Sequence, residues 1–282
     1  MNYILFNPKA NTNTGEKSVE LAKEKLKARF GEIEVVSLID LDKDEFVRSK
    51  TNQDNIVLIG GDGTLNRFVN GLQNRDFECN LYFYKAGTGN DFLKDIEKDI
   101  DADGLALIND YIKQLPYVIV NEKKYYFVNG VGLGIDGEVC VEVEKRKKEG
   151  KKISYAGIAA NLAFFKYKMP NATVVVDGVE IAQDKVWMAS AMNGEYFGGG
   201  LMITPGQDRK SNELTLALIH DASRIFLLLI LSSVRKGKHV KYKKCVDLIK
   251  AHRIEVTFDR PIALQIDGET ILDVTHYVAV KE

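Results

Sequence analysis

A short glycine-rich turn that carries one carboxylate directly follows an all-apolar run near residue 60. Residues 56–59, with the sequence IVLI, are typical of a strand that is buried on both faces. The glycines of the next turn, residues 60–64 (GGDGT), would let backbone N–H groups approach a phosphate closely. Asp62 would repel a bare phosphate, so its carboxylate indicates a Mg²⁺ ion between the two. The alternative is an ordinary strand-to-helix turn that is rich in glycine.

Thr64 is the predicted N-cap of a helix over residues 65–72, so the turn joins a strand to a helix. Two other predicted strands, residues 3–6 and 81–84, also end in polar or glycine-rich loops. The second of these loops reads AGTGND over residues 86–91. Because ligands in open α/β sheets bind at the carboxyl ends of the strands, we expect all three loops to open on one edge of a sheet.

Strand-like and helix-like segments alternate throughout residues 1–115. The last of them is a helix predicted over residues 105–115, which stops before Pro116. This alternation predicts an α/β N-terminal domain with a parallel sheet.

From residue 116 to residue 282 the pattern changes to many strand-like runs separated by turns such as Asp267-Gly268. Helical patterns interrupt these runs only near residues 137–165 and 223–236. The pattern predicts a mostly antiparallel β-sandwich as C-terminal domain, with its last strand a candidate to pack back on the first domain.

The composition is that of a soluble globular protein, with 282 residues of which 45% are hydrophobic and 28% are charged. A formal net charge of −1 argues against bulk electrostatic binding to nucleic acid. Three widely spaced cysteines without a CxxC pair indicate a reducing compartment. The N-terminus lacks a signal-peptide pattern, and the longest apolar run, residues 225–231, is too short to span a membrane. We therefore expect a cytoplasmic protein.

Three motifs together resemble the signatures of the bacterial diacylglycerol kinase and lipid kinase family, whose catalytic domain is shared with sphingosine and ceramide kinases. They are GGDGTLN at residues 60–66, GTGNDF at residues 87–92 and DGE at residues 267–269. The resemblance covers nearly the whole chain and includes Asn7-Pro8 and FVNG at residues 127–130. GGDGT alone is shared with NAD kinases and, loosely, with phosphofructokinases, whereas GTGNDF is similar to the lipid-kinase signature.

The resemblance implies an ATP-dependent lipid kinase with Mg²⁺ as cofactor, and it implies a role for each matching residue. Asp62 would position the catalytic Mg²⁺, directly or through a water molecule. Asp267 would be the general base that takes the proton from the lipid hydroxyl, with Glu269 supporting it. On the residues alone, Asp267-Gly268 reads equally well as a type I′ hairpin turn. The residues expected at the nucleotide are Asn7, Ser37 (where the family usually has Thr), Gly60, Gly61, Gly63, Thr64, Asn66, Thr88 and Asn90.

One segment departs from the family pattern, which usually has an Asp-x-x-Asp-Gly that binds a structural Mg²⁺. Asp208 matches the first ligand, but Ser211 replaces the second ligand and Asn212 replaces the glycine. Arg209 and Lys210 add positive charge where a cation is wanted. We therefore expect this second metal site to be weak or absent.

Three further signals each allow a structural and a functional reading. Residues 132–137 match GxGxxG outside a βαβ context, which favours tight backbone packing over a dinucleotide site. The basic run at residues 145–152 is either a solvated helix end or a contact for anionic lipid headgroups. The aromatic segment at residues 155–167 could line an acyl-chain cleft, although core packing is favoured for most of its rings.

The expected reaction transfers the γ-phosphate of ATP to a lipid hydroxyl, with diacylglycerol or a related lipid as acceptor, in a cleft between the two domains. The lipid would be met at the inner face of the membrane through peripheral contact, and edge strands of the second domain offer a route to a homodimer. Two alternatives stay open. An NAD kinase shares GGDGT and the two-domain plan, but GTGNDF and the late Asp-Gly-Glu argue against it. A non-catalytic nucleotide- or lipid-binding regulator of the same fold is favoured only by the altered segment at residues 208–212.

Overall fold

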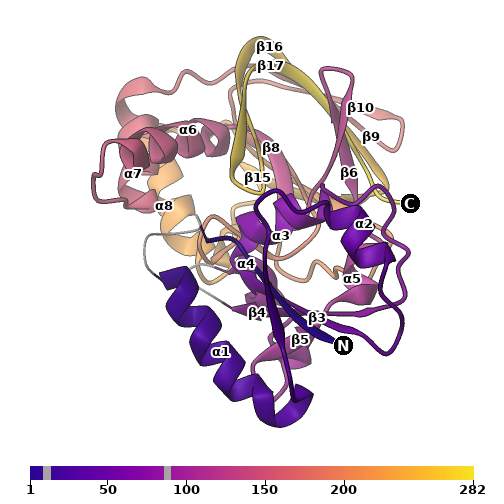
Figure 1. Cartoon of the computed structure of the whole chain (residues 1–282). Coiled ribbons are helices and arrows are strands. Elements are labelled where there is room, and N and C mark those ends of the chain that lie inside the picture. Colours follow the sequence, from indigo (N-terminus) through magenta and orange to yellow (C-terminus); the bar gives the residue numbers. More distant parts are fainter. Residues whose placement is uncertain (9–13, 86–89) are drawn as a thin grey trace. The chain divides into compact units, whose positions relative to one another are not determined.

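The computed structural model describes residues 1–8, 14–85 and 90–282, which divide into two compact units, Met1–Leu115 and Pro116–Glu282 (Figure 1). In the first unit the elements are β1 (Asn2–Phe6), α1 (Thr14–Phe30), β2 (Glu34–Ser37), α2 (Lys43–Arg48), β3 (Asn55–Gly60), α3 (Asp62–Val69), β4 (Asn80–Lys85), α4 (Asp91–Asp95), η1 (Glu97–Asp99), β5 (Leu105–Leu107) and α5 (Asn109–Lys113).

In the second unit the elements are β6 (Tyr117–Val120), β7 (Lys123–Tyr126), β8 (Gly130–Gly134), α6 (Ile135–Lys148), α7 (Tyr155–Asn161), η2 (Leu162–Lys166), β9 (Ala172–Val176), β10 (Val179–Gln183), β11 (Val186–Met192), β12 (Tyr196–Phe197), β13 (Leu201–Met202), β14 (Leu214–His220), α8 (Arg224–Val234), η3 (Lys238–Lys241), β15 (Val246–Ala251), β16 (Arg253–Ile266) and β17 (Glu269–Val280).

Five strands form the sheet of the first unit, in the order β2-β1-β3-β4-β5. β1 pairs in parallel with β2 and with β3, and β3 pairs in parallel with β4. The predicted α/β domain with a parallel sheet is confirmed for these four strands. The fifth strand differs, because β5 runs antiparallel to β4 at the edge of the sheet.

The helix predicted over residues 105–115 is wrong in its first part, where the chain forms β5. Leu105 and Ala106 are buried by pairing with β4, so tertiary contact decides their conformation. Helix α5 begins at Asn109, whose Oδ1 accepts a hydrogen bond from the backbone N–H of Leu81 at 2.8 Å. Its Nδ2 donates to the carbonyl oxygen of Cys79, also at 2.8 Å. Asn109 therefore fixes the change from strand to helix.

Apolar side chains cover both faces of the first sheet. Val57 and Ile59 of β3 belong to a buried cluster with Leu26 of α1. On β4, the ring of Phe83 meets that of Phe92 from α4 edge to face, with 6.0 Å between ring centroids. Because both faces are packed, the described ends of these strands are held in fixed positions.

All strand pairs that the structure describes in the second unit are antiparallel, as predicted. The main sheet has the order β15-β14-β11-β8-β16-β17-β6-β7, with β9 and β10 attached beside β16. β12 and β13 form a small separate sheet. The predicted helical interruptions correspond to α6 with α7 and η2, and to α8.

The hairpin of β16 and β17 connects the two halves of this sheet. Figure 1 shows it as a long curved ribbon in yellow. Its register shifts between Thr257 and Ile262, so the first part of β16 pairs with β9 and the last part with β8. The two halves enclose one apolar core that contains Val174, Leu216 and Leu264. The predicted sandwich is therefore built from one long sheet that bends at the β16–β17 hairpin.

Candidate functional site

Three residues that the sequence assigns to the nucleotide lie at the carboxyl ends of neighbouring parallel strands. Phe6, the last residue of β1, pairs with Ser37 of β2 and with Ile59 of β3. Asn7 follows β1 directly, and Gly60 ends β3. The structure brings Asn7, Ser37 and Gly60 to one edge of the sheet, as expected. Their contacts with a nucleotide stay a prediction.

The glycine-rich turn passes into α3 earlier than the sequence predicts. Gly61 is the N-cap of α3, and its carbonyl oxygen accepts a hydrogen bond from the N–H of Thr64 at 2.9 Å. The prediction that Thr64 caps this helix is therefore wrong, because the extended Gly61 already supplies the first acceptor; Gly63 and Thr64 lie inside the first turn. A Cβ atom at Gly60 would lie 2.5 Å from the Cβ of Thr64, so this packing requires glycine at position 60.

The Asp62 carboxylate joins the two glycine-rich turns. Its Oδ2 accepts a hydrogen bond from the N–H of Asp91 at 2.8 Å, and its Oδ1 accepts one from the N–H of Phe92 at 3.0 Å. Asn90 caps the same helix, α4, with its side-chain oxygen, and its Nδ2 lies 3.5 Å from the carbonyl oxygen of Gly60. The GGDGT turn and the start of α4 therefore form one cluster of loops.

The Asp62 carboxylate fits as a ligand for a Mg²⁺ ion that accompanies a nucleotide, and Asp91 is a candidate for a second ligand. Asp91 is buried, and its backbone is bonded to the Asp62 carboxylate. Carboxylate oxygens can accept more than one contact, so the N–H bonds to Asp62 and a cation are compatible. Among the residues that the structure describes, no three His, Cys, Asp or Glu side chains form a complete metal site.

Asp91, Asn66 and Thr88 are the other residues of the two motifs in this unit. The sequence indicates Asp91 only as part of the GTGNDF motif, whereas the structure shows that it is buried and that its backbone N–H donates to Asp62. Asn66 lies inside α3 and is buried, and Asn70 Nδ2 donates to its backbone oxygen at 3.0 Å. Thr88 lies outside the described residues.

In the second unit, Asp267 both forms a hairpin turn and holds a neighbouring loop. Asp267 and Gly268 have φ angles of 48° and 90°, as expected for the predicted type I′ turn. The Asp267 carboxylate accepts hydrogen bonds from the backbone N–H groups of Val128, Asn129 and Gly130, at 2.6, 2.7 and 3.0 Å. Three such bonds hold the carboxylate in one position. The turn is confirmed, whereas the role of Asp267 as a base stays a prediction.

Two buried cations support the loop that holds Asp267. Arg209 is 7% exposed, and its guanidinium donates to the carbonyl oxygen of Val128 and to Oδ1 of Asn129, each at 2.6 Å. Lys281 is 2% exposed, and its Nζ donates to the carbonyl oxygen of Arg209 and to Oδ1 of Asn193, each at 2.7 Å. Burial, together with the charge of Arg209, lowers the pKa of Lys281 to about 8, so the ammonium form predominates at neutral pH.

The residues around Asp208 do not fit a structural divalent metal ion. Asp208 is exposed, and its Oδ1 accepts a hydrogen bond from the N–H of Lys210 at 2.9 Å. Its backbone oxygen accepts one from Oγ of Ser211 at 2.8 Å. The carbonyl oxygen of the next residue, Arg209, already holds the Lys281 ammonium. A divalent ion at this segment would stand beside the two buried positive charges of Arg209 and Lys281.

Asp136 is a buried carboxylate that sequence reasoning missed. Its Oδ2 accepts hydrogen bonds from Oγ of Ser190 at 3.0 Å and from Nε2 of Gln265 at 3.3 Å. Burial raises the pKa of Asp136, although these two bonds act in the opposite direction. A Cβ atom at Gly132 would lie 2.1 Å from Oγ of Ser190, which confirms tight backbone packing at the GxGxxG match. The signal that could have found Asp136 is an acid directly after this apolar, glycine-rich strand.

Glu269, the other acid of the late motif, begins β17 and is half-buried. Burial raises the pKa of Cys140 on α6 to about 12, and the acidic residues Asp136, Glu144 and Glu269 add to this effect. Its supporting role beside Asp267 stays a prediction.

Two family models match consecutive parts of the chain. Residues 2–118 match the diacylglycerol kinase catalytic domain, and residues 129–281 match the YegS C-terminal NAD kinase beta sandwich-like domain. A "Putative lipid kinase" of Streptococcus pneumoniae serotype 4 (strain ATCC BAA-334 / TIGR4) is 26% identical over 281 residues, which cover 94% of this chain and 90% of that protein. A "Putative lipid kinase" of Staphylococcus aureus (strain MRSA252) is 24% identical over 227 residues, which cover 78% of this chain and 72% of that protein.

A solved structure has the same fold. The crystal structure of "a putative diacylglycerol kinase from Bacillus anthracis str. Sterne" superposes with a TM-score of 0.71 at 18% identity, over 99% of this chain and 93% of that one. The two family models cover both units described above. The chain therefore belongs to the diacylglycerol kinase and lipid kinase family, in which a diacylglycerol kinase catalytic domain precedes a YegS C-terminal NAD kinase beta sandwich-like domain.

Proposed function

We propose that this chain is a kinase that transfers the γ-phosphate of ATP to the hydroxyl group of a lipid, with diacylglycerol as the first candidate acceptor. Family membership supports phosphotransfer and the use of a nucleotide. The observation that carries the proposal is the bonding of the Asp62 carboxylate to the N–H groups of Asp91 and Phe92. It joins the GGDGT turn to the end of the GTGNDF motif at the start of α4.

The nucleotide would bind at the carboxyl edge of the first sheet. The N–H groups of the turn at residues 60–64 and the N-terminus of α3 would hold its phosphates. Asn7 and Ser37, at the neighbouring strand ends, would contact the same molecule. A Mg²⁺ ion held by Asp62 and Asp91 would neutralise charge on the transferring phosphoryl group.

The lipid hydroxyl would donate a hydrogen bond to the Asp267 carboxylate, and Glu269 would support this arrangement. The hydroxyl oxygen would then form a bond to the γ-phosphorus while the bond to the ADP oxygen breaks, and the proton would pass to Asp267. The three N–H bonds hold the Asp267 carboxylate in a fixed position. Phosphoryl transfer depends mainly on alignment and charge neutralisation, so a well-positioned base is sufficient.

The lipid would be taken from a membrane surface through peripheral contact. Phe164 and Phe165 of η2 are exposed, the latter by 79%, whereas Leu162 and Tyr167 of the same segment are buried. Core packing, which the sequence favours for most rings of this segment, is therefore wrong, because Tyr155 is exposed as well and Tyr167 alone of the four rings is buried. Exposed apolar rings beside Lys166 suit an anionic lipid surface, where each basic residue contributes about 1 kcal/mol. No helix in the described part of the chain is both long enough and apolar enough to cross a membrane.

Transfer of radiolabelled γ-phosphate from ATP in the presence of Mg²⁺ tests this proposal. Diacylglycerol and related lipids are offered in mixed micelles, and NAD is offered in parallel. A labelled lipid is the expected product. Label on NAD would overturn the lipid class while retaining the kinase chemistry, and ATP binding without any labelled product would favour a non-catalytic regulator.

A further inference from the structure

We infer that Arg209 and Lys281 are positioning residues: two buried side-chain cations that fix the loop holding Asp267, in the place where a structural metal ion would otherwise be needed. The structural part of this inference depends only on the geometry of the second unit. Its catalytic consequence rests on the proposed function, because Asp267 acts as the base only there.

The first layer of the support is Arg209. Its Nη1 donates a hydrogen bond to the carbonyl oxygen of Val128, and its Nη2 donates one to Oδ1 of Asn129. The backbone N–H groups of the same two residues donate to the Asp267 carboxylate. Val128 and Asn129 are therefore held between a cation on one side and an anion on the other. Movement of this loop changes the position of the carboxylate.

The second layer is Lys281, which closes a ring of hydrogen bonds. Its Nζ bridges the carbonyl oxygen of Arg209 and Oδ1 of Asn193. Asn193 in turn donates from Nδ2 to the carbonyl oxygen of Val128 at 2.9 Å, and its backbone N–H donates to the carbonyl oxygen of Asn129 at 2.8 Å. The ring thus joins four segments that are far apart in the sequence, and all four polar side chains in it are buried.

The oxygen atoms in this ring belong to backbone carbonyls and side-chain amides, the neutral groups that also coordinate hard cations in proteins. Removal of Lys281 would take away the donor to Oδ1 of Asn193 and to the carbonyl oxygen of Arg209, and removal of Arg209 would take away the donor to Oδ1 of Asn129. A divalent ion added beside Arg209 and Lys281 would meet two positive charges. The Arg209 guanidinium and the Lys281 ammonium therefore bind the oxygens that a structural metal ion would otherwise coordinate.

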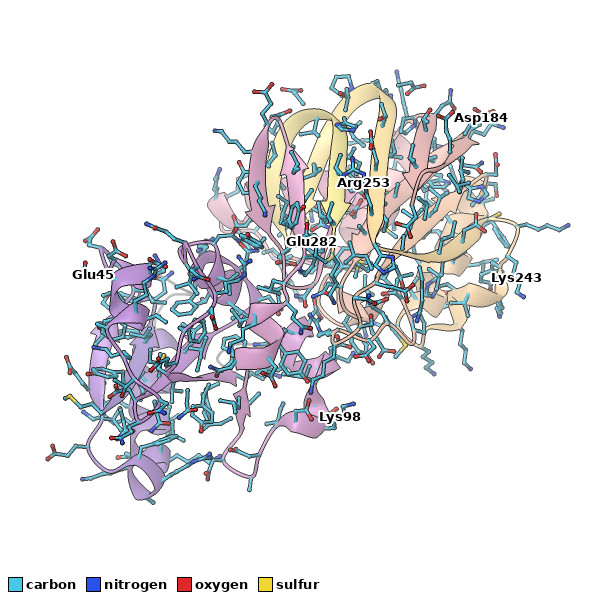
Figure 2. All side chains as sticks on the ribbon, turned by 90° about the vertical axis from the view of Figure 1, so that its right-hand side faces the viewer. Glu45, Lys98, Asp184, Lys243, Arg253 and Glu282 are labelled. Carbon is cyan, nitrogen blue, oxygen red and sulfur yellow. The ribbon has the colours of Figure 1, made fainter. Side chains whose placement is uncertain are left out.

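Amide hydrogen exchange of residues 127–130 measures the positioning directly, whatever the activity. In Lys281→Met and in Arg209→Met, exchange in this loop should become faster by about tenfold or more, because the loop opens locally. Lys243→Met and Arg253→Met are matched controls, since both side chains are exposed (Figure 2) and should leave this exchange unchanged. If Lys281→Met does not fold, Lys281→Gln, which keeps a donor without the charge, replaces it with the same expectation. Unchanged exchange in the folded variants would overturn the inference.

The kinetic test separates positioning from a purely structural role. Lys281→Met should lower kcat for lipid phosphorylation by about tenfold or more through misplacement of Asp267. The KM for ATP should be unchanged, because the nucleotide residues lie in the first unit. Lys281→Arg and Arg209→Lys, which keep the charge, should recover part of kcat. Faster loop exchange with an unchanged kcat would overturn the positioning role.

A third experiment tests whether a metal ion stabilises the fold, and it uses the wild-type chain without nucleotide. Chelation of divalent ions should leave the thermal unfolding temperature unchanged within about 1 °C, because no ion stabilises the folded state. A fall in this temperature that Mg²⁺ or Ca²⁺ reverses would overturn the replacement of a metal by the two cations. If the wild-type chain transfers no phosphate to any lipid, the proposed function fails, while exchange and chelation still decide the inference.

Discussion

Replacing Asp267 by Asn removes one charge while the tight turn is kept. Asp267 has a φ angle of 48°, in the left-handed region that Asn also adopts readily. The N–H of Val128 donates to one carboxylate oxygen, and the N–H groups of Asn129 and Gly130 donate to the other. An amide offers a single oxygen, so its NH₂ group would face at least one of these three donors.

The energetic cost follows from this count of donors. A hydrogen bond to a charged group contributes about 1.5–3 kcal/mol, and a donor that loses its partner costs about 1–3 kcal/mol. If the amide oxygen serves Asn129 and Gly130, the N–H of Val128 loses its acceptor and the other two bonds lose their charge assistance. We expect Asp267→Asn to lower the free energy of unfolding by about 2–4 kcal/mol.

Asp177 provides a matched control for the same substitution. Asp177 and Gly178 form an equivalent turn with φ angles of 47° and 86°, and the Asp177 carboxylate accepts from the N–H groups of His252 at 3.1 Å and Arg253 at 2.8 Å. Burial acts to raise the pKa of Asp177, but the hydrogen bonds from Arg253 and His252 hold it below its ordinary value. Asp177→Asn should cost about 1–3 kcal/mol of stability.

Equilibrium unfolding in urea measures the stability of both variants, and phosphate transfer is then compared at a temperature where both are folded. We expect Asp177→Asn to keep the wild-type kcat, whereas Asp267→Asn should lose about a hundredfold or more of it through loss of the base. If Asp267→Asn has the same free energy of unfolding as the wild type, the hydrogen bonds from residues 128–130 to the Asp267 carboxylate would be refuted. Reduced stability with full kcat would refute the catalytic role.

Three other predictions use single features of the structure. Gly60→Ala should destabilise the chain by about 1–3 kcal/mol, because its Cβ would lie 2.5 Å from the Cβ of Thr64; an unchanged melting temperature would contradict this packing. Burial raises the pKa of Cys79 to about 11, and burial with nearby acids raises that of Cys140 to about 12. Cys79 is buried and Cys140 is half-buried, and both pKa values lie well above 8, so both thiols should react slowly with a disulfide reagent at about pH 8 in the folded chain and faster after unfolding. Rapid labelling of the native chain at either site would contradict these raised pKa values. Burial lowers the pKa of His239, whose Nε2–H donates to the carbonyl oxygen of Ile203. At a pH below 6.5, the ordinary pKa of histidine, His239 binds a proton more readily in the unfolded chain than in the folded chain. The free energy of unfolding should therefore fall as the pH drops from about 7.5 to about 5. His239→Gln should reduce that fall, and an equal fall in the variant would show that other groups cause it.

The local features of the candidate site could be predicted from the sequence. The run at residues 56–59 and the glycines after it specify a buried strand and a tight turn with short-range signals alone. The Asp267-Gly268 turn is equally local, since both residues tolerate positive φ. These signals depend on neighbours in the chain, and the structure agrees with them.

Features that depend on distant partners could not be predicted. Residues 105–107 form a strand because β4 lies beside them, although their sequence also suits a helix. The Asp62 carboxylate reaches backbone groups at residues 91 and 92, and no pattern around Asp62 indicates that. The ring that contains Lys281 joins residues separated by more than seventy positions. Lysine and arginine are usually exposed, so only the tertiary structure identifies Arg209 and Lys281 as buried supports.

Formation of labelled phosphatidic acid from ATP with radiolabelled γ-phosphate and diacylglycerol tests the central claim most directly. Wild-type chain, Asp62→Ala and Asp177→Asn are compared under the same conditions with Mg²⁺. The proposed function predicts label in the extracted lipid for the wild type and for Asp177→Asn, and none above background for Asp62→Ala. Label in lipid at the wild-type rate with Asp62→Ala would contradict the site, and label in water-soluble products alone would contradict the lipid kinase.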